Sequence, residues 1–219
     1  ENEDIQNWSV ALQYWMERTA QDLSSVNTLE IGAGRGGLSL WAALNGMKVL
    51  CTDLQGASKE AIEKHKKFGV SHLVEYEALN ALSIPYSDKF DVVFFKSVLG
   101  GIGSFNNKAN QVKAINEIYK SLKKGGELWF AENLKASPLH RFARRLFVER
   151  VNSWRYVTIQ EMKEFLSVFS EVEYRTAGFL SVFGINSFQR SVLGKIDRII
   201  VDKLFPESWR YIIIGVARK

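Results

Sequence analysis

The stretch Leu29-Glu30-Ile31-Gly32-Ala33-Gly34-Arg35-Gly36-Gly37 places a short apolar strand directly before a glycine-rich turn and the start of a helical pattern. Glycine has no Cβ and tolerates positive φ, so a ligand can approach such a turn closely. In an open α/β sheet, ligands bind beyond the carboxyl ends of the strands. The glycines also satisfy G-x-G-x-x-G, which by itself equally suits a dinucleotide site or a tight turn without a ligand.

On both sides of this turn, apolar runs alternate with helical patterns. Strands are expected at 28–31, 48–54, 72–79, 90–95, 127–132, 172–176 and 210–216. Helices are expected at 6–23, 37–45 before Gly46, 58–68, 108–123 up to Gly125-Gly126, 139–147, 158–169 and 188–204. Thr158 and Glu161 form a capping box at the start of one of them.

Strands separated by helices of this length indicate parallel βαβ units, hence an α/β protein with a doubly wound sheet. We expect a single domain over 1–219, with an N-terminal helical cap at 1–26 and a basic helical insertion at 135–157. No change in composition marks a domain boundary.

Composition excludes several classes of protein. The 219 residues are 46% hydrophobic and carry a net charge of +5, which is too small alone to imply a nucleic-acid partner. The single cysteine, Cys51, rules out an intramolecular disulfide and favours a reducing, cytoplasmic compartment. No uncharged apolar run approaches the ~20 residues of a membrane-spanning helix.

Two acidic residues accompany the glycine turn. Asp53 ends the second strand, where a carboxylate can accept hydrogen bonds from both ribose hydroxyls, although it could equally cap a helix. Glu30 lies two residues before the first glycine, a position that is usually apolar in dinucleotide-binding strands. Its carboxylate could organise the glycine loop, receive a cationic amino group, or form a buried ion pair.

With these acids, Glu30-Ile31-Gly32-Ala33-Gly34-Arg35-Gly36 resembles the E/D-x-G-x-G-x-G signature of class I S-adenosylmethionine-dependent methyltransferases. Asp53 matches their acidic residue at the end of the second strand. Three further segments resemble D-A-x-x-L-P-F, F-D-x-V and G-G-x-L of that family, namely Asn80 to Tyr86, Phe90 to Val93, and Gly125 to Leu128. Order and spacing agree from Leu29 to about Glu132, nearly half the chain.

The resemblance implies a Rossmann-like sheet of seven mostly parallel strands with the last strand antiparallel, and S-adenosylmethionine as cofactor. It also implies a role for each matching position. The methionine moiety is assigned to Glu30, Gly32, Ala33 and Gly34, the ribose to Asp53, the adenine to Leu54, Asn80 and Ala81, and the methionine end beside the substrate to Lys96. Asn80 departs from the family's Asp, and Gly100-Gly101 stand where many relatives have a histidine.

The insertion at 135–157 is the best guide to the methyl acceptor, because it follows the fifth strand and should cover the cofactor edge. It carries six Lys or Arg residues and one acid. Arg141, Arg144 and Arg145 share one helical face that could bind phosphate or carboxylate, or could simply be solvated. Trp154 and Tyr156 could stack on sugar or base rings, or could belong to the core.

A hydroxyl acceptor needs a base, and His140 is the first candidate because imidazole titrates near neutral pH. Glu132 at the end of its strand is the second, and either residue could instead be structural. His65 and His72 are poorer choices, and no spacing of His, Cys and carboxylates suggests a metal site.

The segment from Phe94 to Tyr156 also resembles bacterial methyltransferases associated with O-antigen and other surface-polysaccharide genes. This second resemblance implies O-methylation of a sugar on a glycan precursor, with a lipid-linked acceptor as one form. The basic helix would then meet phosphate or the surface of the inner membrane.

Other functions stay open. The same cofactor could serve an RNA or protein acceptor, although the excess charge is small for RNA. DNA is not expected, because the N-P-P-Y-type tetrad is absent and Cys51 lies within a strand. The glycine pattern also suits an NAD-dependent dehydrogenase, which Glu30 opposes. Asn80 and Gly100-Gly101 would fit a cofactor-binding scaffold without catalytic activity.

Overall fold

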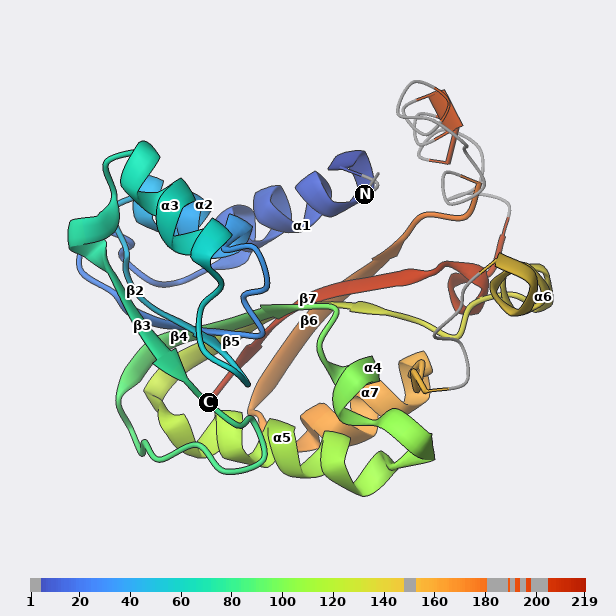
Figure 1. Ribbon diagram of the computed structural model, residues 1–219. Coiled ribbons are helices and arrows are strands. Elements are labelled where there is room, and N and C mark those ends of the chain that lie inside the picture. Colours follow the sequence, from blue (N-terminus) through green and yellow to red (C-terminus); the bar gives the residue numbers. More distant parts are fainter. Residues whose placement is uncertain (1–4, 148–152, 181–188, 190–191, 194–195, 198–204) are drawn as a thin grey trace.

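The computed structural model describes residues 5–147, 153–180, 189, 192–193, 196–197 and 205–219. Within these residues, seven strands form one sheet in the order β3-β2-β1-β4-β5-β7-β6, in which only β7 runs antiparallel to its neighbours (Figure 1). The strands are β1 (Asn27–Ile31), β2 (Lys48–Asp53), β3 (Val74–Ala78), β4 (Phe90–Lys96), β5 (Leu122–Asn133), β6 (Glu171–Ala177) and β7 (Ile212–Arg218). This confirms the expected fold class.

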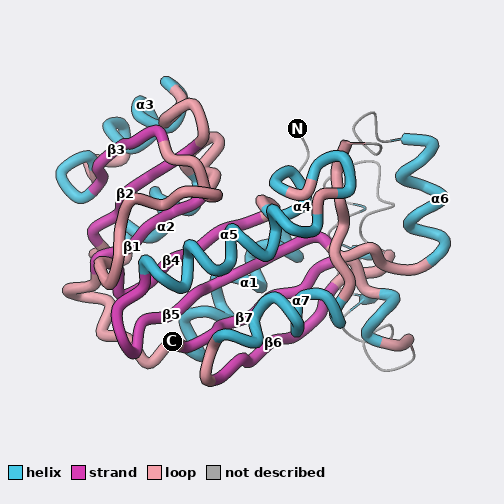
Figure 2. The backbone as a smooth tube through the Cα atoms, turned by 90° about the horizontal axis from the view of Figure 1, so that it is seen from below, coloured by secondary structure: helices cyan, strands magenta, loops and turns pink. Residues whose placement is uncertain are grey.

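Helices cover both faces of the sheet. They are α1 (Ile5–Arg18), α2 (Gly37–Leu44), α3 (Lys59–Lys67), α4 (Leu99–Ile102), α5 (Lys108–Ser121), α6 (Pro138–Phe147) and α7 (Ile159–Phe165). Figure 1 shows α1, α2 and α3 on one face, and Figure 2 shows α5 and α7 lying across the other. Helix α6 lies beyond the carboxyl end of β5, outside both layers.

The two layers bury alternate residues of the central strands. In β4, Val93 and Phe95 belong to the core under α5 and α7, while Val92 and Phe94 belong to the core under α1 and α2. All four side chains are fully buried. This period of two on a strand covered on both sides explains why the sequence there is a nearly continuous apolar run.

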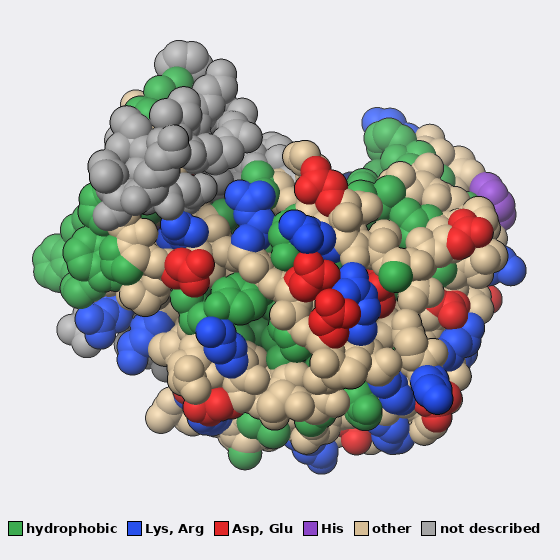
Figure 3. Space-filling model, turned by 180° about the vertical axis from the view of Figure 1, so that it is seen from behind, with side chains coloured by type: hydrophobic (Ala, Val, Ile, Leu, Met, Phe, Trp, Pro, Cys, Tyr) green, Lys and Arg blue, Asp and Glu red, His purple; other side chains and the backbone are tan. Residues whose placement is uncertain are grey.

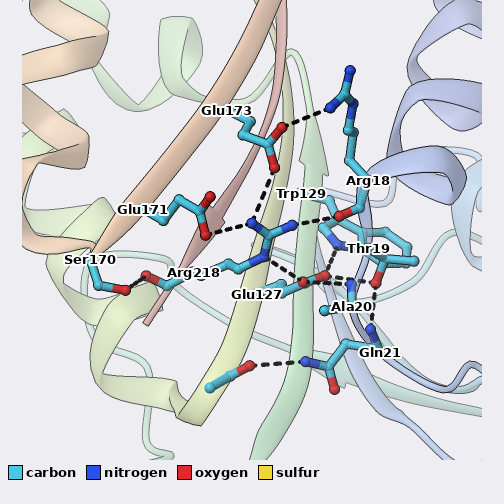
Figure 4. Close-up of polar contacts among 11 residues, drawn as sticks. Arg18, Thr19, Ala20, Gln21, Glu127, Trp129, Ser170, Glu171, Glu173 and Arg218 are labelled. Carbon is cyan, nitrogen blue, oxygen red and sulfur yellow. Dashed lines mark hydrogen bonds and ion pairs between the residues drawn. The ribbon is translucent and has the colours of Figure 1, made fainter.

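A polar network at the amino end of β5 fixes α1 to the sheet (Figure 4). The fully buried Glu127 accepts hydrogen bonds from the Thr19 hydroxyl at 2.7 Å and the Ala20 amide at 3.0 Å, and pairs with the Arg218 guanidinium at 3.2 Å. The helix expected at 6–23 was therefore too long. It ends at Arg18, because Glu127 takes up the backbone and side-chain donors that follow.

Other boundaries differ by smaller amounts. The helix expected at 108–123 ends at Ser121, and β5 begins at once with Leu122, so Gly125-Gly126 lie within the strand instead of stopping the helix. The capping box of Thr158 and Glu161 is present at the start of α7. Gly46 follows the helix cap Asn45 with φ of 85°. The helix expected at 188–204 lies largely outside the described residues.

The two ends of the insertion pair with each other, just after β5 and just before α7. Leu134 and Val157 form an isolated bridge, and the Lys135 amide donates to the Val157 carbonyl at 2.8 Å.

The described helices include none that is long and apolar enough to span a membrane.

Candidate cofactor and acceptor site

The glycine turn joins β1 to α2 with backbone angles that favour glycine. Gly32 has φ of 71° and Gly34 has φ of 52°. A Cβ at Gly32 would come within 2.6 Å of a Val98 methyl group, whereas a Cβ at Gly34 would meet nothing within 4 Å. Gly32 therefore lets the loop approach the segment after β4, and the space beside Gly34 is open to a ligand.

Glu30 lies beneath the loop, not on its open side. Its carboxylate is 2% exposed and accepts hydrogen bonds from the amide of Ser39, at 2.9 Å, and from the Ser39 hydroxyl. Burial raises the pKa of Glu30 to about 7, while the bonds from Ser39 oppose the shift. The carboxylate thus organises the first turn of α2, directly after the glycine loop; of the three roles considered for it, organising the loop is the nearest. Ser39 was not singled out from sequence, where a serine in a helix carries no distinctive signal.

Asp53 connects the second strand to the glycine loop. One carboxylate oxygen accepts from the Gly34 amide at 3.0 Å and the other from the Leu54 amide at 2.7 Å. Each oxygen keeps a second lone pair, so the carboxylate can still accept from a pair of ribose hydroxyls. The neighbouring Leu54 side chain is 61% exposed, as expected for an apolar surface that an adenine ring would cover.

The two residues assigned to the adenine edge differ in exposure. Asn80 is exposed, and its side-chain oxygen accepts from the Leu82 amide at 2.9 Å, which makes a local turn. Ala81 is buried and belongs to the core under α5. Asn80 and Ala81 follow β3 and Asp53 ends β2, so parallel pairing of these strands brings all three to one edge of the sheet. Ala33 is buried in the glycine loop and donates its amide to the Thr52 carbonyl at 2.8 Å.

The carboxyl end of β4 borders the loop from the other side. Lys96 is half-buried there, and its charge acts to lower the pKa of Glu30. The fully buried Glu132 accepts from the backbone amides of Val98 at 2.9 Å and Leu99 at 2.7 Å with one oxygen, and from Asn133 at 2.8 Å with the other. Burial raises the pKa of Glu132 to about 7. It positions the start of α4.

Gly100-Gly101 face the indole ring of Trp154. A Cβ at Gly100 would lie 1.8 Å from Trp154 Nε1, and one at Gly101 would lie 3.3 Å from the ring. The indole therefore fills the space that a side chain would need at these two positions. Packing against Trp154 therefore explains why Gly100-Gly101 depart from the family pattern, and the indole ring covers this side of α4.

His140 is held on both sides of its ring. It is 2% exposed, with Nδ1 at 2.7 Å from the Ser137 hydroxyl and Nε2 at 2.9 Å from the Phe179 carbonyl. Burial is the largest influence and lowers the pKa of His140. In this conformation both ring nitrogens of His140 are bonded to the protein, so the ring can take a proton from an acceptor only by giving up one of these bonds. Oε1 of Glu132 keeps a free lone pair, but the side chain is fully buried.

Arg141 and Arg144 of the insertion do not share one exposed face. Arg141 is exposed, but Arg144 turns inward and donates to the carbonyls of Leu134 at 2.8 Å and Lys135 at 3.2 Å. Its guanidinium lies 3.8 Å from the centre of the Tyr156 ring. Burial lowers the pKa of Arg144, and no carboxylate of the described residues pairs with it. The Arg145 side chain is outside the described part.

Sequence reasoning missed the residue that anchors the end of the insertion, Arg155. Its guanidinium contacts Glu161 on α7, Gln111 on α5 at 2.5 Å, and Asn106 at 3.2 Å. Gln111 is fully buried and donates to the carbonyls of Leu99 and Arg155. An arginine between two aromatic residues carries no sequence signal for contacts with elements so far apart in the chain.

Comparisons with known proteins agree with this arrangement. Residues 29–130 match the family model described as a methyltransferase domain. The chain is an S-adenosylmethionine-dependent methyltransferase. The residues present fit that cofactor, since the open space beside Gly34, the Asp53 carboxylate and the exposed Leu54 lie at one edge of the sheet. No curated protein matches the chain in sequence.

Solved structures similar to this methyltransferase share its fold at low sequence identity. The cyclase SpnF is 19% identical, with a TM-score of 0.63 over 96% of this chain and 80% of that one. Phosphoethanolamine N-methyltransferase 2 of Haemonchus contortus, in complex with S-adenosyl-L-methionine, is 17% identical, with a TM-score of 0.68 over 97% of this chain and 52% of that one. The 1,6-didemethyltoxoflavin-N1-methyltransferase of Burkholderia thailandensis is 16% identical, with a TM-score of 0.63 over 100% of this chain and 79% of that one. At these identities the likeness shows the fold and not the acceptor.

The described residues contain no group of three or more His, Cys, Asp or Glu that could hold a metal ion. Burial raises the pKa of the Cys51 thiol to about 12, so it is no nucleophile near neutral pH.

Proposed function

We propose that this methyltransferase binds S-adenosylmethionine at the edge formed by the glycine loop, Asp53 and Leu54, and transfers the methyl group to an oxygen of a sugar, glycan precursor or other small molecule. The observation that carries the cofactor site is the Asp53 carboxylate, which is bonded to the amide of Gly34 beside open space. The sulfonium cofactor supplies an already activated methyl group, so holding the acceptor in line with it provides much of the rate.

The proposed acceptor site lies between α4 and α6. Trp154 covers the first turn of α4, and Tyr156 lies under Arg144 at the base of α6. Among the described residues, no carboxylate pairs with the partly buried guanidinium of Arg144, and a buried guanidinium in that situation is costly unless an anion completes its bonds. Only one guanidinium nitrogen of Arg144, Nη1, donates to carbonyls of the described residues. The remaining N–H groups therefore favour an acceptor that carries a phosphate or carboxylate, as a sugar phosphate would.

Deprotonation of a hydroxyl acceptor is proposed for His140, with Glu132 as the second candidate. His140 would have to release Ser137 or Phe179 when the acceptor binds, as catalytic hydrogen bonds often rearrange in the bound complex. The variant His140→Ala should then lower turnover while leaving the affinity for S-adenosylhomocysteine unchanged. Full turnover in that variant would remove His140 as the base.

We also propose that α6 meets the membrane surface, as a lipid-linked acceptor would require. Leu139 is 53% exposed and Phe142 is 62% exposed, and the exposed Arg141 lies between them in the sequence. Figure 3 shows apolar side chains at the edge of the molecule where α6 lies, with basic side chains beside them. Exposed apolar side chains with basic neighbours suit an anionic lipid surface.

The membrane proposal is tested by sedimentation with vesicles of anionic or neutral lipid. Binding to anionic vesicles should fall sharply in Phe142→Ser and in Arg141→Ser. Equal sedimentation of these variants and the wild type, or no sedimentation at all, would contradict it.

The acceptor is tested by transfer of a radiolabelled methyl group to a fractionated bacterial extract. Label in a polar glycan or lipid-linked fraction supports the proposal, and label that is sensitive to ribonuclease or protease would favour the RNA or protein alternative. Calorimetry with S-adenosylhomocysteine and with NAD distinguishes the cofactor, and binding of NAD alone would refute the cofactor site.

A further inference from the structure

Helix α3 packs directly under the glycine loop. A Cβ at Gly36 would lie 2.6 Å from the Ala61 side chain and 2.8 Å from His65 Nε2, so Gly36 permits this close approach. Ala61 and His65 are both fully buried and are one helical turn apart.

Three side chains of α3 and its cap each bind one of three successive loop carbonyls. The hydroxyl of Ser58 donates to the Gly34 carbonyl at 2.8 Å. The ammonium of Lys64 donates to the carbonyl of Arg35 at 2.7 Å. Nε2 of His65 lies 2.8 Å from the carbonyl oxygen of Gly36 and must be the donor, because a carbonyl only accepts. We define Ser58, Lys64 and His65 as the α3 clamp.

The third member of the clamp is itself held in place. Nδ1 of His65 lies 2.9 Å from the Tyr76 hydroxyl, and the two rings stack with their planes 13° apart. Since Nε2 carries the proton, a neutral His65 accepts at Nδ1 from Tyr76. The loop, α3 and the edge strand β3 are thereby joined through one imidazole.

The carbonyl orientation decides which way the loop amides point. In a planar trans peptide, the N–H points opposite to the carbonyl. A carbonyl of Gly34 that is turned toward Ser58 therefore directs the following Arg35 amide away from α3. The same holds for the next two peptides, of which the Gly36 amide already donates to the Ala33 carbonyl at 2.8 Å. The open space beside Gly34 lies along this loop.

We propose that the α3 clamp preorganises the glycine loop for the cofactor, so that Ser58, Lys64 and His65 are positioning residues that set cofactor affinity without touching the cofactor. This inference rests on the proposed placement of the cofactor at the loop. Without the clamp, the Gly34 and Arg35 carbonyls lose these bonds and their peptides can rotate, whereas the Gly36 carbonyl still accepts from the Leu40 amide at 3.0 Å. Cofactor binding must then restore the lost order.

The test is calorimetric binding of S-adenosylhomocysteine to Ser58→Ala, Lys64→Met and His65→Leu, at a temperature where each is folded. We expect affinity about three- to ten-fold weaker for each, because each loses its hydrogen bond to a loop carbonyl; Ser58→Ala also loses its bond from the Ala61 amide, and His65→Leu its bond to Tyr76. His65→Gln should regain affinity to within about twofold of the wild type, because its amide nitrogen can replace Nε2 as donor. Lys67→Met, an exposed change at the end of the same helix, is the matched control.

Affinities of Lys64→Met and Ser58→Ala within about twofold of the wild type would overturn the proposal, even if His65→Leu failed to fold. Equal weakening in His65→Leu and His65→Gln would likewise contradict it, because it would indicate a packing role. A wild-type protein that binds no S-adenosylhomocysteine would refute the cofactor site itself, and the clamp with it.

Discussion

Replacement of Asp53 by alanine is the sharpest test of the cofactor site. In the proposed complex, the carboxylate accepts from both ribose hydroxyls while it keeps its bonds to the amides of Gly34 and Leu54. Hydrogen bonds to a charged group contribute about 1.5–3 kcal/mol each. Losing two of them costs about 3–6 kcal/mol, which corresponds to an affinity that is weaker by a factor between about 150 and about 25,000.

The assay is calorimetric titration with S-adenosylhomocysteine, with thermal unfolding of the same samples. Asp91→Asn is the matched control. Asp91 also joins strands, accepting from the Asn27 amide at 2.8 Å and Lys123 at 2.7 Å, but it lies at the opposite edge of the sheet. We expect Asp91→Asn to lower the unfolding temperature and leave affinity unchanged. If Asp53→Ala binds the ligand as tightly as the wild type does, the ribose assignment is wrong.

Three further variants probe the acceptor side. Gly100→Ala should lower the free energy of unfolding by about 3 kcal/mol or more, because its methyl group would overlap the Trp154 ring. In the double variant with Trp154→Ala, much of this loss should be recovered. If denaturant unfolding shows that the losses of the two single variants simply add in the double variant, the contact between Gly100 and Trp154 is contradicted. Glu132 has a folded pKa of about 7, raised by burial, so the folded protein binds more protons than the unfolded chain between about pH 4.5 and 7 and loses stability as the pH rises through that window. Glu132→Gln removes this loss, so its stability relative to the wild type should rise by about 3 kcal/mol across the window, and a constant difference would refute the buried acid. Burial lowers the pKa of His140, so the stability that its neutral ring contributes is present above pH 6.5 and is lost as the pH falls below that value. His140→Gln should therefore lose less stability on acidification than the wild type does. Parallel curves of stability against pH for the two proteins would contradict this.

Local patterns in the sequence were enough to predict the sheet and the cofactor edge. Apolar runs of strand length, the glycine turn and the acid that ends β2 are short-range signals, because each reflects the geometry of a few consecutive residues. The positions of Glu30, Gly34 and Asp53 at one edge then follow from parallel pairing alone.

What the acceptor side looks like depended on contacts between distant segments. Arg144 and Arg141 have the same charge and lie on one short helix, yet only the tertiary structure turned Arg144 onto Tyr156 and left Arg141 in solvent. His140 was the first candidate base, with a structural role as the alternative, and the carbonyl of Phe179, 39 positions away in the sequence, binds its ring. The α3 clamp was invisible for the same reason, since helix and loop meet only in the folded chain. The periodicity of apolar residues in the sequence predicts which face of a helix or strand is buried. It does not predict which distant segment covers that face, because this depends on packing across the whole fold.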